Sequence, residues 1–260
     1  MAKKMPWEYD PFPPFRIFGN LYFVGTKPYS THLIDTGEGL ILIDPGTLEG
    51  LHLVVDKIWR LGFRPEDVKI ILISHAHYDH SDAARALKEM TGAEICLGRR
   101  DLRLVTGEIF HYPLIPFKPD RLLEDGDIVS LGNTAVKCLA TPGHTEGCFS
   151  FFFPVTDGKK TVRAGMFGGA GMNSMEKAFL EENGLSLGVR DEFLQSLEKA
   201  RKEKVDLFVG NHASQNDTPA KYARLLQGET DAFLDPDEWE KRLDSWKEKL
   251  LTMLRKEGTL

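Results

Sequence analysis

The segment 74–81 concentrates four possible metal ligands within six residues. His75, His77, Asp79 and His80 follow a continuous apolar run and precede a stretch with helical spacing. Imidazoles and a carboxylate are costly to bury together unless something binds them. Zinc accepts histidine nitrogen and aspartate oxygen at ~2.0–2.2 Å, and a tight turn can present such ligands to two ions. The cluster therefore predicts a metal site at a strand end, where α/β sheets place their ligand sites.

Two further histidines lie in comparable positions. His144 follows the strand predicted at 134–139, and His212 follows the strand predicted at 205–209. Either one alone is weak evidence, but with the first cluster they give six donors that all arrive at strand ends. No such pattern surrounds the remaining histidines, which are His32, His52 and His111. Of these, His111 lies in a predicted loop and is a candidate for substrate contact.

Hydrophobic patterning predicts a layered α/β protein. Short apolar runs between residues 15 and 44 are separated by glycine-containing turns, as in hairpins, and the run 68–73 is typical of a strand covered on both faces. Helical spacing at 48–61, 81–90 and 190–202 makes helices alternate with strands. We find no linker and predict a single domain over residues 1–260.

Three segments carry further expectations. Segments 107–120 and 165–188 are long and irregular, which makes them candidates for the walls of a substrate pocket. Residues 236–257 show a long helical pattern with one apolar stripe. The stripe predicts packing on the same domain, with a homo-oligomer interface as the alternative. Charges of both signs on the polar face argue against membrane-surface binding.

Composition excludes several classes of function. The formal net charge of −6 argues against broad nucleic-acid binding, which needs a basic face. Residues 1–14 contain no apolar stretch of the secretory type, and no segment approaches the ~18 apolar residues of a membrane span. The three cysteines show no disulfide pattern. We therefore expect a cytoplasmic protein with a small-molecule substrate and neither nucleic-acid nor membrane partners.

The ligand pattern resembles the metallo-β-lactamase superfamily. The resemblance runs from about Phe15 to His212 and includes the His-x-His-x-Asp-His cluster, the Pro-Gly-His-Thr setting of His144, and the Asp-Pro-Gly turn at 44–46. It implies an αββα sandwich with a site for two zinc ions at one edge of the sheets. It also implies two ligand sets: His75, His77 and His144 for the first ion, and Asp79, His80 and His212 for the second.

Departures from the family pattern indicate which branch of the superfamily the sequence resembles most. Glyoxalase-II-like and lactonase-like members carry a metal-bridging aspartate after the strand that follows the Pro-Gly-His motif, whereas residues 164–169 here contain no carboxylate. The cysteine ligand of the first β-lactamase subclass is also missing from this stretch. The pattern is therefore most similar to the third subclass. The serines that hold the β-lactam carboxylate there are replaced by Met166 and a glycine pair, and Ser174 is the candidate substitute.

This resemblance implies a zinc-dependent hydrolase in which a metal-bound hydroxide attacks a carbonyl-type bond of a β-lactam-like amide, an ester or a lactone. Zinc suits this role because it lowers the pKa of bound water to about 7. Asp79 is predicted to be both a ligand and the catalytic group that orients the attacking water. We expect Tyr78 to act mainly in packing, and Asp44 to hold a ligand histidine by a hydrogen bond.

Other functions are compatible with the same fold. An iron-dependent oxygenase or oxidoreductase would keep the histidine motif and hold iron in place of zinc, and manganese is a further alternative metal. A flavin-linked di-iron enzyme would need a glutamate where His77 stands, and a nuclease would need basic surface and added domains. A non-catalytic metal-binding module would have an eroded ligand set, whereas all six ligands are intact.

Overall fold

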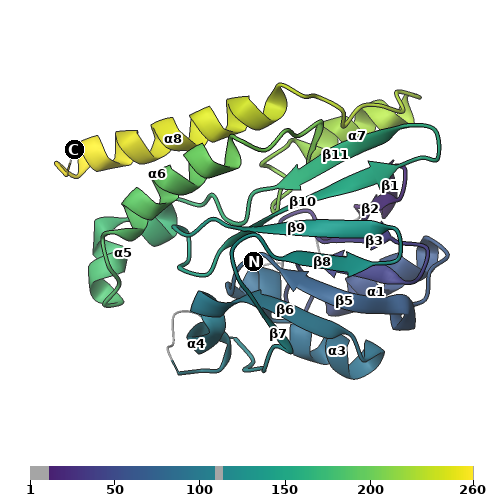
Figure 1. The fold of residues 1–260 in the computed structure, drawn as a ribbon, viewed down its shortest axis with the longest axis horizontal. Coiled ribbons are helices and arrows are strands. Elements are labelled where there is room, and N and C mark those ends of the chain that lie inside the picture. Colours follow the sequence, from purple (N-terminus) through teal and green to yellow (C-terminus); the bar gives the residue numbers. More distant parts are fainter. Residues whose placement is uncertain (1–11, 109–113, 260) are drawn as a thin grey trace, which may run out of the picture.

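Two facing β-sheets with helices on both outer sides form the protein (Figure 1). The computed structural model describes residues 12–108 and 114–259, so the expectation for His111 lies outside the described residues. This arrangement is the αββα sandwich that the family resemblance implies. The expected fold class is therefore confirmed.

The first sheet follows the order of the chain from β1 to β7. Its strands are β1 (Phe15–Phe18), β2 (Leu21–Phe23), β3 (His32–Asp35), β4 (Leu40–Ile43), β5 (Val68–Ile73), β6 (Glu94–Gly98) and β7 (Arg121–Leu123). Pairing is antiparallel from β1 to β4 and parallel from β4 to β7. Its connections carry helices α1 (Leu51–Arg60), α2 (Tyr78–Ser81), α3 (Ala84–Thr91) and α4 (Leu102–Val105), and the short 3₁₀ turns η2 (Pro65–Asp67) and η3 (Arg99–Asp101).

The second sheet has the strand order β12-β11-β10-β9-β8. Its strands are β8 (Ile128–Leu131), β9 (Thr134–Ala140), β10 (Phe149–Thr156), β11 (Thr161–Met166) and β12 (Leu207–Phe208). All neighbours pair antiparallel except β11 and β12, which are parallel. The remaining helical elements are η4 (Asn173–Met175), α5 (Lys177–Glu182), α6 (Val189–Ala200), α7 (Thr218–Leu226) and α8 (Glu238–Lys256).

The position of β5 explains why residues 70–73 are apolar without interruption, whereas Lys69 near the start of the strand is exposed. Ile70 and Leu72 belong to the core between the two sheets, whereas Ile71 and Ile73 belong to the core under α1 and α3. Alternate side chains of a strand point to opposite faces, so a strand with both faces covered needs no polar position. The segment that carries four of the predicted metal ligands begins directly after this buried strand, which gives it a rigid support.

Helix α8 lies along the outer face of the second sheet (Figure 1). Its apolar stripe is buried there among residues of β10, β12 and α6: Trp239, Leu243, Trp246, Leu250 and Leu254. The Trp246 ring lies 5.2 Å from the Phe167 ring and 5.9 Å from the Phe208 ring. The stripe therefore packs within its own chain, as expected. Self-association of the chain stays a prediction.

The structure differs from the sequence expectations at several elements. Strands β6 and β7 were not predicted, because they are short and carry no clear alternation. The helix expected at 81–90 is α3, which begins at Ala84. The short helix α2 precedes it, and Asp82 between the two accepts hydrogen bonds from the amides of Leu48 and Ile115. None of the helices in the described part of the chain is long and apolar enough to cross a membrane.

The packing of α8 yields a stability prediction. Replacing Trp246 with alanine should lower the free energy of unfolding by about 3–5 kcal/mol, because it opens a cavity in a close-packed aromatic cluster. Urea unfolding followed by circular dichroism measures this change. Trp59→Ala is the matched control, since the Trp59 side chain is 51% exposed and its loss should cost within about 0.5 kcal/mol. Equal losses in both variants would contradict the assigned packing.

Candidate metal centre

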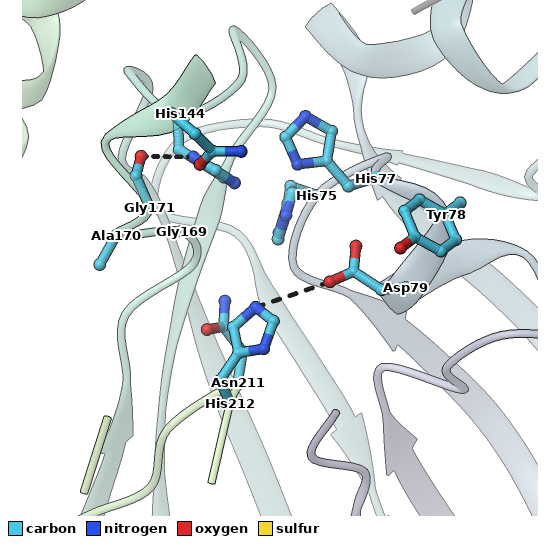
Figure 2. Close-up of a pocket in the computed structure, with 11 residues that line it drawn as sticks. His75, His77, Tyr78, Asp79, His144, Gly169, Ala170, Gly171, Asn211 and His212 are labelled. Carbon is cyan, nitrogen blue, oxygen red and sulfur yellow. Dashed lines mark hydrogen bonds and ion pairs between the residues drawn. The ribbon is translucent and has the colours of Figure 1, made fainter. Parts of the chain in front are cut away.

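The six predicted ligands come from three turns that follow three strands. His75, His77, Asp79 and His80 follow β5, His144 follows β9, and His212 follows β12. Figure 2 shows that side chains from all three turns point into one cavity between the edges of the sheets. Residues more than 130 positions apart in the chain therefore meet at a single site.

The ligands form two groups of three. One group is His75, His77 and His144, the other is Asp79, His80 and His212, and within each group the donor atoms lie within 4.8 Å of one another. In the second group, Nε2 of His80 lies 3.2 Å from Nε2 of His212 and 3.4 Å from Oδ2 of Asp79. Such spacings suit three donors around one ion. The grouping matches the one implied by the family resemblance.

Asp44 orients two of the imidazoles. It is fully buried, and its Oδ2 lies 3.0 Å from Nδ1 of His80 and accepts a hydrogen bond of 2.7 Å from the Ser74 hydroxyl. Because that hydroxyl donates to Asp44, it accepts from Nδ1–H of His75 at 3.0 Å. Each ring thus keeps its Nε2 for the cavity. Nε2 of His75 is buried and has no partner among the described residues, as expected of a metal ligand.

Backbone carbonyls orient the two histidines from the other turns. Nδ1 of His144 lies 2.8 Å from the Gly171 carbonyl oxygen, and Nδ1 of His212 lies 2.9 Å from the Pro28 carbonyl oxygen. Metal-bound histidines characteristically donate their second N–H in this way. The hydroxyl of Ser174 also contacts Nδ1 of His144 at 2.7 Å and donates to its carbonyl oxygen. Ser174 therefore holds His144, a predicted ligand, and its hydroxyl is not available for the substrate-carboxylate role considered from the sequence.

The charge states of His75, His144 and Asp79 suit metal ligation. Burial lowers the pKa of His75 well below its usual value and that of His144 to about 4, so both rings are neutral at pH 7. Burial raises the pKa of Asp79, but attraction to His80 and His212 outweighs this and holds it well below its usual range. Asp79 is therefore an anion. The charges of Asp79 and Asp44 raise the pKa of His80 to about 10 against the opposing effect of burial.

Asp101 connects two of the ligand-bearing turns and was not found from the sequence. It is fully buried and accepts hydrogen bonds from the amide of Ala76 at 2.8 Å, the hydroxyl of Thr145 at 2.7 Å and the amide of Gly147 at 2.7 Å. Burial raises its pKa to about 6. Ala76 lies between two ligands and Thr145 follows a third, so this carboxylate fixes the first ligand group. No local motif marks it, because its partners are 25 to 46 residues away.

The cavity at the ligands has a volume of about 280 Å³. Besides the ligands, its lining consists of Tyr78, Gly169, Ala170, Gly171, Asn173 and Asn211. Tyr78, which we expected mainly to pack, lies on this wall with its hydroxyl 3.5 Å from the hydroxyl of Tyr29. Segment 165–188 thus contributes a wall as predicted. No described residue of 107–120 lines this cavity.

Glycines at 169 and 171 have a steric cause. A Cβ on Gly169 would lie 2.6 Å from Cδ2 of His144, and one on Gly171 would lie 2.9 Å from Cε1 of the same ring. Both distances are shorter than van der Waals contact. The backbone of this loop can therefore pack against the His144 ring only if residues 169 and 171 have no side chain. This close contact explains why residues 169 and 171 are glycines.

The role of Asp44 generates a prediction about metal affinity. Asp44 has a backbone φ of 55°, which asparagine tolerates, so Asp44→Asn removes the charge without new backbone strain. Its amide would place N–H groups against the N–H of His80 and the hydroxyl of Ser74. We expect about 10- to 100-fold weaker metal binding, measured by competition with a chromophoric chelator. Asp217→Asn is the matched control, because Asp217 is exposed and has a φ of 53°; equal affinities in the two variants would contradict the role of Asp44.

Comparisons with known proteins agree with this geometry. FEZ-1 metallo-beta-lactamase from Legionella gormanii is 32% identical and superimposes with a TM-score of 0.91, covering 99% of this chain and 100% of that chain. BJP-1, a subclass B3 metallo-beta-lactamase of Bradyrhizobium japonicum, is 31% identical with a TM-score of 0.86 and 96% coverage of both chains. The expected likeness to the third subclass is confirmed.

Curated relatives match over a shorter segment. A probable metallo-hydrolase of Burkholderia pseudomallei (strain 1710b) is 36% identical over 104 residues, and a hydroxyacylglutathione hydrolase of Chelativorans sp. (strain BNC1) is 33% identical over 100 residues. Each match covers 38% of this chain and 34% of the relative, so it spans about a third of those proteins. A family profile described as the metallo-beta-lactamase superfamily matches residues 24–158, just over half of the chain. The chain therefore belongs to the metallo-β-lactamase superfamily.

Proposed function

We propose that the protein is a binuclear zinc hydrolase that cleaves a carbonyl-type bond in a small molecule. His75, His77 and His144 would hold one zinc ion, and Asp79, His80 and His212 would hold the other. The substrate bond would be a β-lactam-like amide, an ester or a lactone. The similarity to metallo-β-lactamases and, over a shorter segment, to hydroxyacylglutathione hydrolases supports this range of acyl substrates.

One observation carries the proposal: the six candidate ligands form two groups of three, and most of their ring nitrogens are already held in place. Four imidazoles have one ring nitrogen held by Asp44, by the Ser74 hydroxyl or by a backbone carbonyl, and the other nitrogen faces the cavity. The buried Nε2 of His75 has no partner within the described residues. A buried nitrogen without a partner costs about 1–3 kcal/mol, which an ion at this position would recover. The all-nitrogen and nitrogen–oxygen sets both suit zinc.

The protein residues supply orientation and charge in the proposed reaction. Bound zinc would lower the pKa of coordinated water to about 7 and polarise a carbonyl oxygen. Asp79 is anionic and lies on the cavity wall, so its carboxylate would accept a hydrogen bond from the attacking water and fix the direction of attack. Asp44 and Asp101 keep the ligand turns in place during the reaction, which preserves the geometry that catalysis needs.

A first prediction concerns activity. The zinc-loaded protein should hydrolyse at least one of a chromogenic cephalosporin, a 4-nitrophenyl ester or a homoserine lactone at a rate well above that of the same protein after chelation and dialysis. Readdition of zinc should restore the rate. Turnover of the cephalosporin would place β-lactams within the substrate range, and turnover of the esters alone would restrict it. No metal-dependent turnover of any of the three substrates would contradict the proposed function.

A second prediction concerns the ligands. His77→Ala should lower the zinc content from about two ions to about one per chain and reduce the hydrolysis rate by more than about 100-fold, because a ligand of the first ion is lost. Elemental analysis measures the content and also reports iron or manganese. His52→Ala is the matched control, because His52 is exposed on α1. A His77→Ala protein with full zinc content and full rate would contradict the ligand assignment.

A further inference from the structure

The loop between β11 and α5 contacts His144 at one end and the C-terminal end of α8 at the other. Nδ1 of His144 lies 2.8 Å from the Gly171 carbonyl oxygen and 2.7 Å from the Ser174 hydroxyl. Further along, the amide of Lys177, the first residue of α5, donates to Oε1 of Glu257 at 3.0 Å. Glu257 is the residue that directly follows α8. This loop therefore joins a predicted metal ligand to the end of a distant helix.

Arg190 connects the middle of the loop with the same carboxylate. It lies on α6 and donates from Nε to the carbonyl oxygen of Met175 at 2.8 Å and from Nη2 to Oε2 of Glu257 at 2.6 Å. Helices α5 and α6 and the C-terminal end of α8 lie at the same end of the molecule (Figure 1). One guanidinium and one carboxylate thus hold two backbone groups of the loop, directly after the serine that contacts His144.

The position of Arg190 depends on the charge of Glu257. Arg190 is only 4% exposed, and its guanidinium pairs with the Glu257 carboxylate. Removing one partner of a buried ion pair leaves the other charge uncompensated, which is strongly unfavourable. Without the charge of Glu257, we therefore expect Arg190 to turn toward water and to release the Met175 carbonyl oxygen.

Apolar packing does not replace these hydrogen bonds. The Met175 side chain is buried in the same core cluster as Phe167 and Trp246. Apolar contacts have no preferred direction, so they keep this side chain in the core without fixing where the neighbouring hydroxyl points. Hydrogen bonds are directional, and those made by Arg190 and Glu257 fix the backbone on the far side of Ser174.

We propose that Glu257 is a positioning residue for the metal centre, which acts on His144 through Arg190 and the Ser174 hydroxyl. A histidine ligand binds a metal less well when the contact that holds its second nitrogen is lost. His144 belongs to the first ligand group, so the affinity for the first ion should respond and the affinity for the second should not. This inference rests on the metal assignment within the proposed function.

The test removes the charge of Glu257 and measures zinc affinity by competition with a chromophoric chelator. A His212→Ala background lacks a ligand of the second group and isolates the first ion. There, Glu257→Gln should weaken zinc binding by about two- to thirtyfold, the range for residues that act on a site through others. In a His77→Ala background, which isolates the second ion, the same change should alter the affinity by less than about twofold. Equal weakening of both ions, or of neither, would overturn the proposal.

Glu248→Gln is the matched control in both backgrounds. Glu248 also lies on α8, its side chain is 64% exposed, and its hydrogen bonds are with Arg255 and Thr252 of the same helix. The substitution removes the same charge and an ion pair from the same helix, but leaves the contacts of Arg190 and Glu257 with the loop in place. It should change neither zinc affinity. A loss as large as that in Glu257→Gln would show a general charge effect and overturn the proposal.

A double-mutant cycle tests the path through the serine. Ser174→Ala alone should weaken binding of the first ion, because Nδ1 of His144 loses a contact. With Ser174 already replaced, Glu257→Gln should lower the affinity by less than about twofold further, since residues of one hydrogen-bond network are not additive. Fully additive losses would overturn the path through Ser174.

Zinc affinity is measured without turnover, so this inference and the proposed function can fail separately. Selective weakening of the first ion in a protein that hydrolyses none of the test substrates would support the positioning role and count against the hydrolase. Metal-dependent hydrolysis with an unchanged first-ion affinity in Glu257→Gln would support the hydrolase and overturn the positioning role.

Discussion

Two buried carboxylates fix the geometry on which the candidate metal centre depends. Asp44 and Asp101 are fully buried, and each accepts three hydrogen bonds from the turns that carry the ligands. A buried carboxylate without donors costs several kcal/mol, so each turn is confined to the conformation that supplies its donors. The ligands are thus positioned by the protein, before an ion contributes.

The packing of the two sheets determines where the predicted ligands meet. Parallel pairing of β5 within the first sheet and of β12 with β11 in the second brings the carboxyl ends of both strands to one edge, where the ligands converge. Polar groups at this edge face the cavity of about 280 Å³.

Much of the fold and of the ligand set could be predicted because the signals are local. The apolar run of β5, the apolar stripe of α8 and the His-x-His-x-Asp-His cluster each lie within one short continuous segment of the sequence. Strands β6 and β7 were missed because such short strands show no distinctive alternation of apolar and polar residues. Asp101 was missed because its partners lie 25 to 46 residues away, and Ser174 was assigned toward the substrate although its hydroxyl contacts His144.

By itself, the sequence determined which six residues are the candidate metal ligands, which strands precede them and which family the chain resembles. These features depend on residue type and on spacing along the chain, which are visible in one dimension. Only the tertiary structure decided which atoms hold the second nitrogen of four of the imidazoles, and that Asp101 joins two of the turns that carry the predicted ligands. Those outcomes depend on distances between segments far apart in the chain, and such distances exist only once both sheets have packed against each other.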